Sequence, residues 1–168
     1  MEEELKNISS REEAINKVKE KGKNLEFLSN EFQNDKEVVI NALEQDGESL
    51  EFASDELKDD KEVVMLAISK SPWTAYYASE RLKADKEVIL ASVKDYGQTL
   101  YYASEELRDD DEVVKAAITN KGLIIKYASF RLRDNKEFAE IAVKQNKEAY
   151  HFLSSRLKQD EEIKALLG

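Results

Sequence analysis

The chain of 168 residues contains no cysteine, one proline, five glycines and a single histidine. Without cysteine, neither a disulfide nor thiolate chemistry is available, and a reducing compartment is allowed. The small number of glycines and prolines leaves little room for linkers or disordered tails. No stretch approaches the length of a membrane span, and residues 1–5 are acidic where a signal peptide needs a basic and then an apolar run. These absences predict a soluble protein, cytoplasmic by default, with no membrane partner.

Basic residues are also in deficit, because 36 acids face 26 bases and the formal net charge is −10. Phosphate binding needs a clustered positive surface, so direct nucleic-acid binding is not expected. The charge is uneven: residues 24–73 carry 13 acids and 4 bases, whereas residues 124–148 carry 4 acids and 6 bases. The simplest interpretation is a solvated acidic surface that keeps the protein soluble.

One unit of 25 residues recurs along the chain, most plainly from Ser49 to Leu123. The run Leu50–Ser54 returns as Ala75–Ser79 and Leu100–Ser104, and Asp60–Val64 returns as Asp85–Ile89 and Asp110–Val114. A fixed period of this size is the signature of a repeat protein. The sequence therefore predicts an all-α fold, an α-solenoid or superhelix of about six tandem 25-residue helix-turn-helix repeats.

This interpretation makes residues 1–168 a single repeat domain. Residues 1–23 form an N-terminal capping region and a half repeat, and residues 24–148 form five full repeats. Residues 149–168 form a truncated C-terminal repeat.

Each repeat is expected to hold two short helices with turn residues at both ends. Asn24, Ser49, Thr74 and Thr99 are candidate N-caps of a first helix of about nine residues. The second helix is expected to follow an N-cap residue in every copy: Asp35, Asp60, Asp85, Asp110, Asn135 and Asp160. Glycine is expected to end the second helix in the left-handed conformation at 47, 97 and 122, with Pro72 ending it in one copy.

The expected core lies on one face of each helix. Leu50, Ala53 and Leu57 share a face of the first helix, and the second helix places Val63, Val64, Ala67 and Ile68 inward. The second face that Phe52 requires is expected to pack against an adjacent repeat. Truncating Leu82 or Tyr77 to alanine is expected to cost about 2–5 kcal/mol.

These blocks carry a resemblance. The pattern L-x-Y-A-S-x-x-L-x-x-D-x-E-V-V, found in units such as Leu100–Ile118, is similar to that of a bacterial and protist repeat family catalogued as a domain of unknown function. The similarity covers about residues 10–168, and Phe138 and Ala139 depart from the Val-Val pair. The resemblance implies an α-helical repeat and brings no catalytic or ligand residues.

The residues typical of catalysis do not form a site. The serine repeated at 29, 54, 79, 104, 129 and 154 has no general base in each copy, because His151 is the only histidine. Its hydroxyl is expected to bond a carbonyl one turn back. Asp59-Asp60 and Asp109-Asp110-Asp111 lack the spacing of a metal loop and are expected to be caps and first-turn charges of the second helix. His151 is expected on the surface, and no cofactor or metal is predicted.

Two surface features remain as candidates for binding a partner. Trp73, Tyr76, Tyr101 and Phe130 form an outward aromatic set over neighbouring repeats, which is typical of an interface. The alternative is that Trp73 fills the gap left by Pro72 and that the tyrosines lie flat over the array. Ile40, Met65 and Leu90 share an outward position of successive second helices, where contact between helices is the simpler explanation.

The predicted function is a non-enzymatic protein–protein interaction scaffold or adaptor that binds a protein partner across several repeats. The alternative is an acidic decoy or inhibitor, in which residues 24–73 occupy the basic groove of a nucleic-acid-handling protein. Hydrolytic or metal-dependent catalysis is the least favoured class. The apolar end Ala165–Leu167 leaves three options: self-association through the C-terminal end of the array, a chain cut from a longer protein, or fraying of the last turn.

Overall fold

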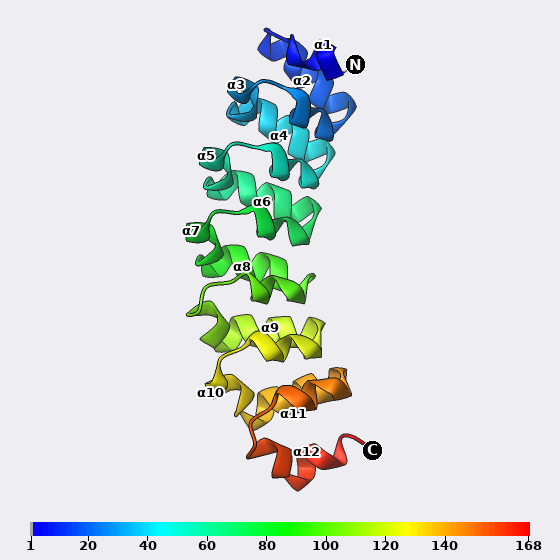
Figure 1. Cartoon of the computed structure of the whole chain (residues 1–168), viewed down its shortest axis with the longest axis vertical. Helices are drawn as coiled ribbons and strands as arrows, with labels where there is room; N and C mark the ends of the chain where they lie inside the picture. Colours follow the sequence, from blue (N-terminus) through cyan, green and yellow to red (C-terminus); the bar gives the residue numbers. More distant parts are fainter. Residues whose placement is uncertain (1) are drawn as a thin grey trace. The chain divides into compact units, whose positions relative to one another are not determined.

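The computed structural model describes residues 2–168, and these residues hold helices and connecting turns but no β-strand. It divides into two compact units, residues 1–82 and residues 83–168. In each unit, short helical repeats stack on one another (Figure 1). The all-α repeat fold expected from the sequence is confirmed.

The first unit contains three copies of a pattern in which an α-helix is followed by a 3-10 segment. Its elements are α1 (Glu2–Lys6), α2 (Arg11–Glu20), η1 (Gly22–Phe27), α3 (Asn30–Gln33), α4 (Lys36–Gln45), η2 (Gly47–Phe52), α5 (Asp55–Lys58), α6 (Lys61–Lys70) and η3 (Pro72–Tyr77). Helix α7 (Glu80–Lys83) lies at the boundary between the units. Helices α2, α4 and α6 pack in succession, and so do η1, η2 and η3.

The second unit continues the same pattern. Its elements are α8 (Lys86–Val93), η4 (Gly97–Tyr101), η5 (Leu107–Asp109), α9 (Asp111–Asn120), η6 (Gly122–Tyr127), α10 (Phe130–Arg133), α11 (Lys136–Gln145), η7 (Lys147–Phe152), η8 (Leu157–Gln159) and α12 (Glu161–Ala165). Helices α8, α9, α11 and α12 pack in succession, with η4, η6 and η7 forming a second layer.

The longer α-helices begin where the sequence predicts. Asp35 Oδ1 accepts hydrogen bonds from the backbone N–H groups of Glu37 at 3.0 Å and Val38 at 3.3 Å. Equivalent caps are formed by Asp60, Asp85, Asp110, Asn135 and Asp160. Each cap satisfies N–H groups that have no partner within the helix.

The predicted inward face of these helices is buried. Val63, Val64 and Ala67 of α6 are fully buried and Ile68 nearly so, and Leu50, Ala53 and Leu57 join the core. Leu82 is fully buried as well. Spacings of one, four and five residues place the four α6 side chains on a single stripe, which packs against the next layer of helices.

The first helix of each repeat is not continuous, so the prediction of a nine-residue helix was wrong. For example, the 3-10 segment η2 ends at Phe52, and the next two residues are extended before the short α-helix α5 begins. Ser54, for example, has φ −62° and ψ 159°. Ser49, Thr74 and Thr99 are buried inside the 3-10 segments, and none of Asn24, Ser49, Thr74 and Thr99 is an N-cap; Lys21, Asp46, Ser71 and Tyr96 occupy that position.

The break has a physical reason, because it frees a backbone N–H for the preceding repeat. The N–H of Ser79 donates to the carbonyl oxygen of Lys58 at 3.0 Å, and that of Ser129 donates to Arg108 at 2.9 Å. The bond recurs at Ser54, Ser104 and Ser154. Inside a continuous helix this N–H would be used within its own repeat.

The repeated glycines were also misassigned. In the described residues only Gly168 has a positive φ, so the internal glycines do not end helices in the left-handed conformation. They begin 3-10 segments, at a point of close approach. A Cβ on Gly97 would lie 2.7 Å from the carbonyl oxygen of Ala117 in the next repeat. Glycine is needed there for space and not for an unusual φ.

Candidate interaction surfaces

Two adjacent positions at the C-terminal end of each 3-10 segment differ in burial and in how much the residue varies between repeats. The inner of the two is aromatic and half-buried in every copy: Phe27, Phe52, Tyr77, Tyr102, Tyr127 and Phe152. The outer one varies: Glu26, Glu51, Tyr76, Tyr101, Lys126 and His151. In three repeats the outer side chain packs against the inner ring: Tyr76 on Tyr77, Tyr101 on Tyr102 and Lys126 on Tyr127. The outer position therefore varies the chemistry of this face from repeat to repeat.

In the first unit, the aromatic residues gather at η3. Trp73 is half-buried, with its ring centroid 5.5 Å from that of Tyr77. Tyr76 is 47% exposed and lies edge-on to Tyr77, with centroids 5.1 Å apart. Burial, together with a hydrogen bond to the carboxylate of Glu51, raises the pKa of the Tyr77 hydroxyl to about 12. Trp73 thus packs against Tyr77 within the cluster, while Tyr76 is its solvent-exposed member.

In the second unit, rings of two successive repeats meet. Tyr101 is 54% exposed, and its centroid lies 4.8 Å from Tyr127 and 4.9 Å from Tyr102. The amine of Lys126 lies 4.8 Å from the ring centroid of Tyr127 and 5.9 Å from that of Phe152. Both distances are within the range of cation–π attraction. The surface therefore combines aromatic rings with one cation, Lys126, which lies close to the rings of Tyr127 and Phe152.

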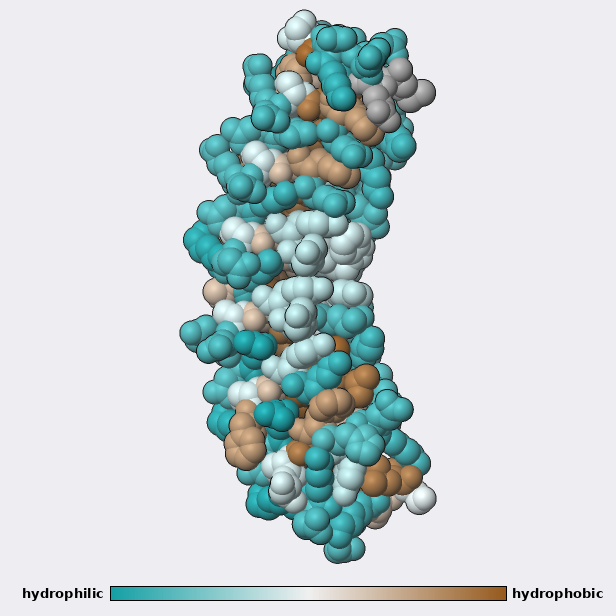
Figure 2. All heavy atoms as spheres, in the orientation of Figure 1, coloured by the Kyte–Doolittle hydropathy of each residue, from teal (hydrophilic) through white to brown (hydrophobic). Residues whose placement is uncertain are grey.

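Phe130 extends this surface at the start of α10. Its side chain is 66% exposed, although it is large and apolar. It lines a cavity of about 380 Å³ together with Tyr127, Arg108 and Arg133. The lower part of Figure 2 shows brown side chains standing among hydrophilic ones in the second unit. We call Tyr101, Tyr102, Lys126, Tyr127, Phe130 and Phe152 the aromatic surface of the second unit.

The four residues selected from the sequence therefore fall into two pairs. Trp73 and Tyr76 belong to the first unit, whereas Tyr101 and Phe130 belong to the second. Sequence reasoning missed Tyr127, Arg108 and Arg133. The signal for Tyr127 was present, because every repeat has an aromatic residue at that position.

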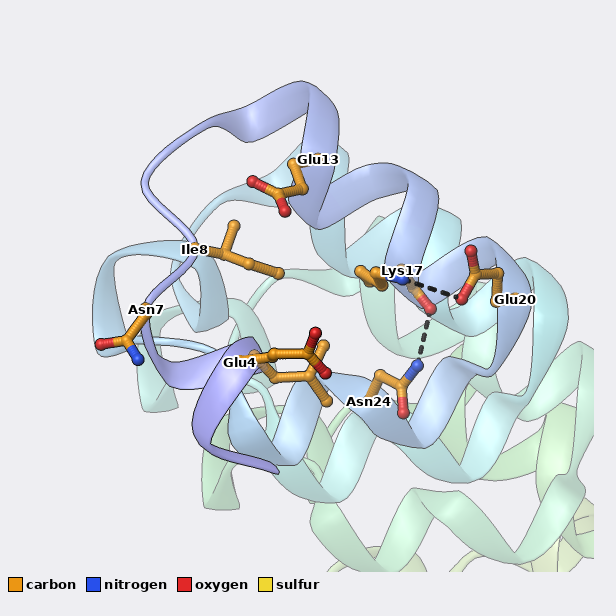
Figure 3. A pocket seen from close by; sticks show the side chains of 8 residues that line it. Glu4, Asn7, Ile8, Glu13, Lys17, Glu20 and Asn24 are labelled. Carbon is orange, nitrogen blue, oxygen red and sulfur yellow. Dashed lines mark hydrogen bonds and ion pairs between the residues drawn. The ribbon is translucent and has the colours of Figure 1, made fainter. Parts of the chain in front are cut away.

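A further cavity, of about 580 Å³, lies near the N-terminal end of the first unit (Figure 3). Glu4, Glu13 and Glu20 line it, with Ile8 pointing inward. The carboxylate of Glu20 is 3.3 Å from the amine of Lys17, so one of these charges is already paired. Over residues 2–168, no group of three or more histidine, cysteine or acidic residues is arranged to hold a metal ion.

The repeated serine joins repeats to one another. The Ser79 hydroxyl donates to the carboxylate of Asp59, and its oxygen accepts the N–H of Leu82 at 3.2 Å. The expected bond to a carbonyl one turn back is not how this hydroxyl is used. Asp59 and Asp109 likewise accept from serine and arginine and are not N-caps, unlike Asp60 and Asp110. Asp111 lies in the first turn of α9, as predicted. The serine hydroxyl thus forms part of the contact between neighbouring repeats.

The other candidates from the sequence differ in their exposure. His151 is exposed, as predicted. Ile40, Met65 and Leu90 are half-buried, which agrees with helix-to-helix contact more than with a free surface. Leu166 and Leu167 are half-buried and pack against the core of the second unit. No helix within residues 2–168 combines the length and apolar character needed to cross a membrane.

Charge separates the two units. Residues 1–82 carry 20 acids and 11 bases, a net charge of −9, whereas residues 83–168 carry 16 acids and 15 bases, a net charge of −1. Ion pairs between repeats use part of both sets: Lys36 with Asp60 at 2.8 Å and Lys136 with Asp160 at 3.0 Å. The second unit therefore repels an anionic partner far less than the first does.

Residues 10–58, 39–83, 60–108, 85–133 and 135–163 match the family described as a domain of unknown function (DUF4116). The first four segments overlap, the fifth is separate, and together they cover residues 10–133 and 135–163, so the chain belongs to this family. Neither the curated proteins nor the solved structures contain a match.

Proposed function

We propose that the chain is a non-catalytic interaction module that binds a protein partner through exposed aromatic residues of its 3-10 segments and of α10. The observation that carries the proposal is the exposure of Tyr101 and Phe130 beside Tyr127, on one surface of the second unit. Large exposed aromatic side chains on a rigid scaffold supply contact area at low entropic cost, which makes them typical hot-spot residues.

The repeat itself supports this proposal. At the Tyr101 position other repeats use glutamate, lysine or histidine, and at the Phe130 position they use Asn30, Asp55, Glu80, Glu105 or Ser155. The fold therefore does not need an aromatic residue at either place. An apolar side chain that is not required for packing favours a role in binding.

The test uses peptides, since binding to a defined ligand can be measured directly. Random peptides displayed on phage are selected on the wild-type chain and counter-selected on a Tyr101→Glu/Phe130→Asn variant. Both replacements are residues that other repeats use, so the variant is expected to melt at the wild-type temperature. Enriched peptides that bind the wild type and lose at least about tenfold in affinity on the variant support the proposal.

The first unit is assessed separately with Tyr76→Glu, which copies Glu26 and Glu51. If neither variant changes the binding of any selected peptide, the aromatic residues are not the interface. If both variants unfold, these side chains belong to the core and the proposal fails.

A second candidate, the acidic decoy, is favoured by one observation, the net charge of −9 on residues 1–82. It places the contact on carboxylates and not on aromatic rings. Such binding weakens steeply between low and high salt, because the charges are screened over about 8–10 Å at physiological ionic strength. If the chain binds a basic protein with an affinity that does not change with salt, the acidic-decoy function is excluded.

A further inference from the structure

The cavity beside Phe130 is lined by both aromatic and cationic side chains. Tyr127 and Phe130 line it together with Arg108 and Arg133, and Glu105 and Asp109 complete the lining. Its volume of about 380 Å³ suits one or two side chains and not a folded domain. A ligand of this size would meet aromatic rings and guanidinium groups in the same cavity.

The arginines of the second unit fall into two groups. Arg131 and Arg156 already form ion pairs. Nε of Arg131 lies 2.9 Å from Asp109 Oδ1, and Nε of Arg156 lies 3.0 Å from Asp134 Oδ1. Arg108 and Arg133 differ, because the Nε–H of each is buried without an acceptor. Their other contacts are weak, with Arg108 Nη2 3.9 Å from Glu105 and Arg133 Nη1 3.4 Å from the carbonyl oxygen of Phe152.

The two carboxylates in the lining do not neutralise these arginines. Asp109 accepts from the Ser129 hydroxyl and from Arg131 Nε at 2.9 Å, so its charge is already paired. The Glu105 side chain is 91% exposed and lies at the limit of an ion pair with Arg108. Two guanidinium groups with little compensation thus stand next to two aromatic rings.

We propose that this cavity binds an acidic peptide segment of a partner protein, an assignment that rests on the proposed function and adds the chemistry of the partner. An apolar side chain of the peptide packs against Phe130 and Tyr127, and a neighbouring carboxylate pairs with Arg108 and Arg133. A guanidinium offers a carboxylate two parallel N–H donors, which makes it the best-matched cation for this group. The choice of occupant rests on charge complementarity, since Lys126 adds a third cation to the same surface.

The repeats themselves provide matched variants. The position of Arg108 and Arg133 is Gln33 in the first repeat and Lys58, Lys83 and Lys158 in others. Arg108→Gln/Arg133→Gln removes both charges with a side chain that the fold already accepts. Arg108→Lys/Arg133→Lys keeps the charges and removes the two parallel N–H donors of each guanidinium. Lys121→Gln/Lys144→Gln removes two charges from the same unit outside the cavity.

The probe is a fluorescein-labelled peptide in which glutamate alternates with phenylalanine, and its partner probe has lysine in place of glutamate. Fluorescence anisotropy is expected to show binding of the glutamate peptide alone. The affinity is expected to fall about tenfold in the glutamine variant and less in the lysine variant, with no more than a twofold change in the control. Phe130→Asn is expected to weaken binding as well, and it serves as the second variant if the glutamine variant melts early.

Equal binding of the two peptides, or equal loss in the glutamine variant and in the control, would overturn this inference. So would binding that appears only with self-association of the chain, detected by sedimentation. The proposed function has its own readout, because selected peptides that depend on Tyr101 and Phe130 but carry no acidic residue would support that function and exclude an acidic partner.

Discussion

The hydroxyl of Ser79 donates a hydrogen bond to the carboxylate of Asp59, which lies 20 residues earlier in the preceding repeat. Arg81 closes the arrangement, with Nε 2.9 Å from Oδ1 of Asp59 and Nη2 2.5 Å from the Asp59 carbonyl oxygen. The same three-residue clamp is formed by Ser129, Asp109 and Arg131 and by Ser154, Asp134 and Arg156. Consecutive repeats are therefore held in register by side chains as well as by the core.

These clamps predict a dependence of stability on acid. The hydrogen bond from Ser129 and the guanidinium of Arg131 hold the pKa of Asp109 below its ordinary value. A carboxyl with a lowered folded-state pKa contributes stability above the unfolded value of about 3.9, and the contribution is lost as pH falls through the folded-state value. Carbon-detected NMR titration is expected to find the pKa values of Asp109 and Asp134 below the ordinary aspartate value.

The matched variant is Asp109→Asn, because Asn34 already accepts a hydrogen bond from the Ser54 hydroxyl at 2.5 Å. This variant keeps the serine contact and removes the charge. As the pH is lowered, the free energy of unfolding of the variant is expected to fall less steeply than that of the wild type. Identical curves would show that the charge of Asp109 adds nothing to the clamp.

One joint in the second unit lacks the clamp, which predicts a stabilising substitution. Ala84 stands where the acceptor would be, and Glu106 stands where arginine would be, although the backbone bond from Ser104 to Lys83 remains at 3.1 Å. Ala84→Asp with Glu106→Arg is expected to complete the clamp and raise the Tm by a few degrees at most, since the pair is exposed. Glu106→Arg alone is the control, because it adds the cation without its partner. A double variant that melts no higher than this control would contradict the prediction.

The sequence was sufficient for the repeat, which recurs every 25 residues, and for its longer helices, whose signals lie within one copy. An N-cap such as Asp60 acts on residues two and three positions away, and Val63, Val64 and Ala67 reveal their shared face by spacing alone. The broken first helix was not visible. It depends on a bond from Ser79 to Lys58 in the preceding repeat, and local periodicity contains no information on that bond.

The candidate surface was only partly predictable for the same reason. Tyr76, Tyr101 and Phe130 are aromatic where other repeats are polar, and the structure exposes all three. Arg108 and Arg133 look like ordinary surface cations in the sequence. The role proposed for them depends on which arginines the clamps already use, and Asp109 and Arg131 are 22 residues apart in different repeats.

The glycines predict a steric effect that depends on the next repeat. Gly97→Ala is expected to destabilise the second unit by about 1–3 kcal/mol, because the new Cβ would meet the carbonyl oxygen of Ala117 at 2.7 Å. Lys147 holds the equivalent position in the last repeat, so Lys147→Ala is the control and is expected to be nearly neutral. Chemical denaturation gives both values. A stabilising Gly97→Ala would mean that the neighbouring helix can move away.

Two residues of the short helix α10 separate core from surface. Leu132 is fully buried, so Leu132→Ala is expected to cost about 2–5 kcal/mol of unfolding free energy through lost burial and the cavity left behind. Phe130 is two residues earlier and 66% exposed, so Phe130→Asn is expected to change stability by less than about 0.5 kcal/mol. Asparagine occupies this position at Asn30, at the start of α3, which makes it compatible with the first turn of the helix. Urea denaturation of the two variants tests the contrast directly. If Phe130→Asn costs as much as Leu132→Ala, the phenylalanine is part of the core, and both the proposed interface and the acidic-peptide site lose their apolar anchor.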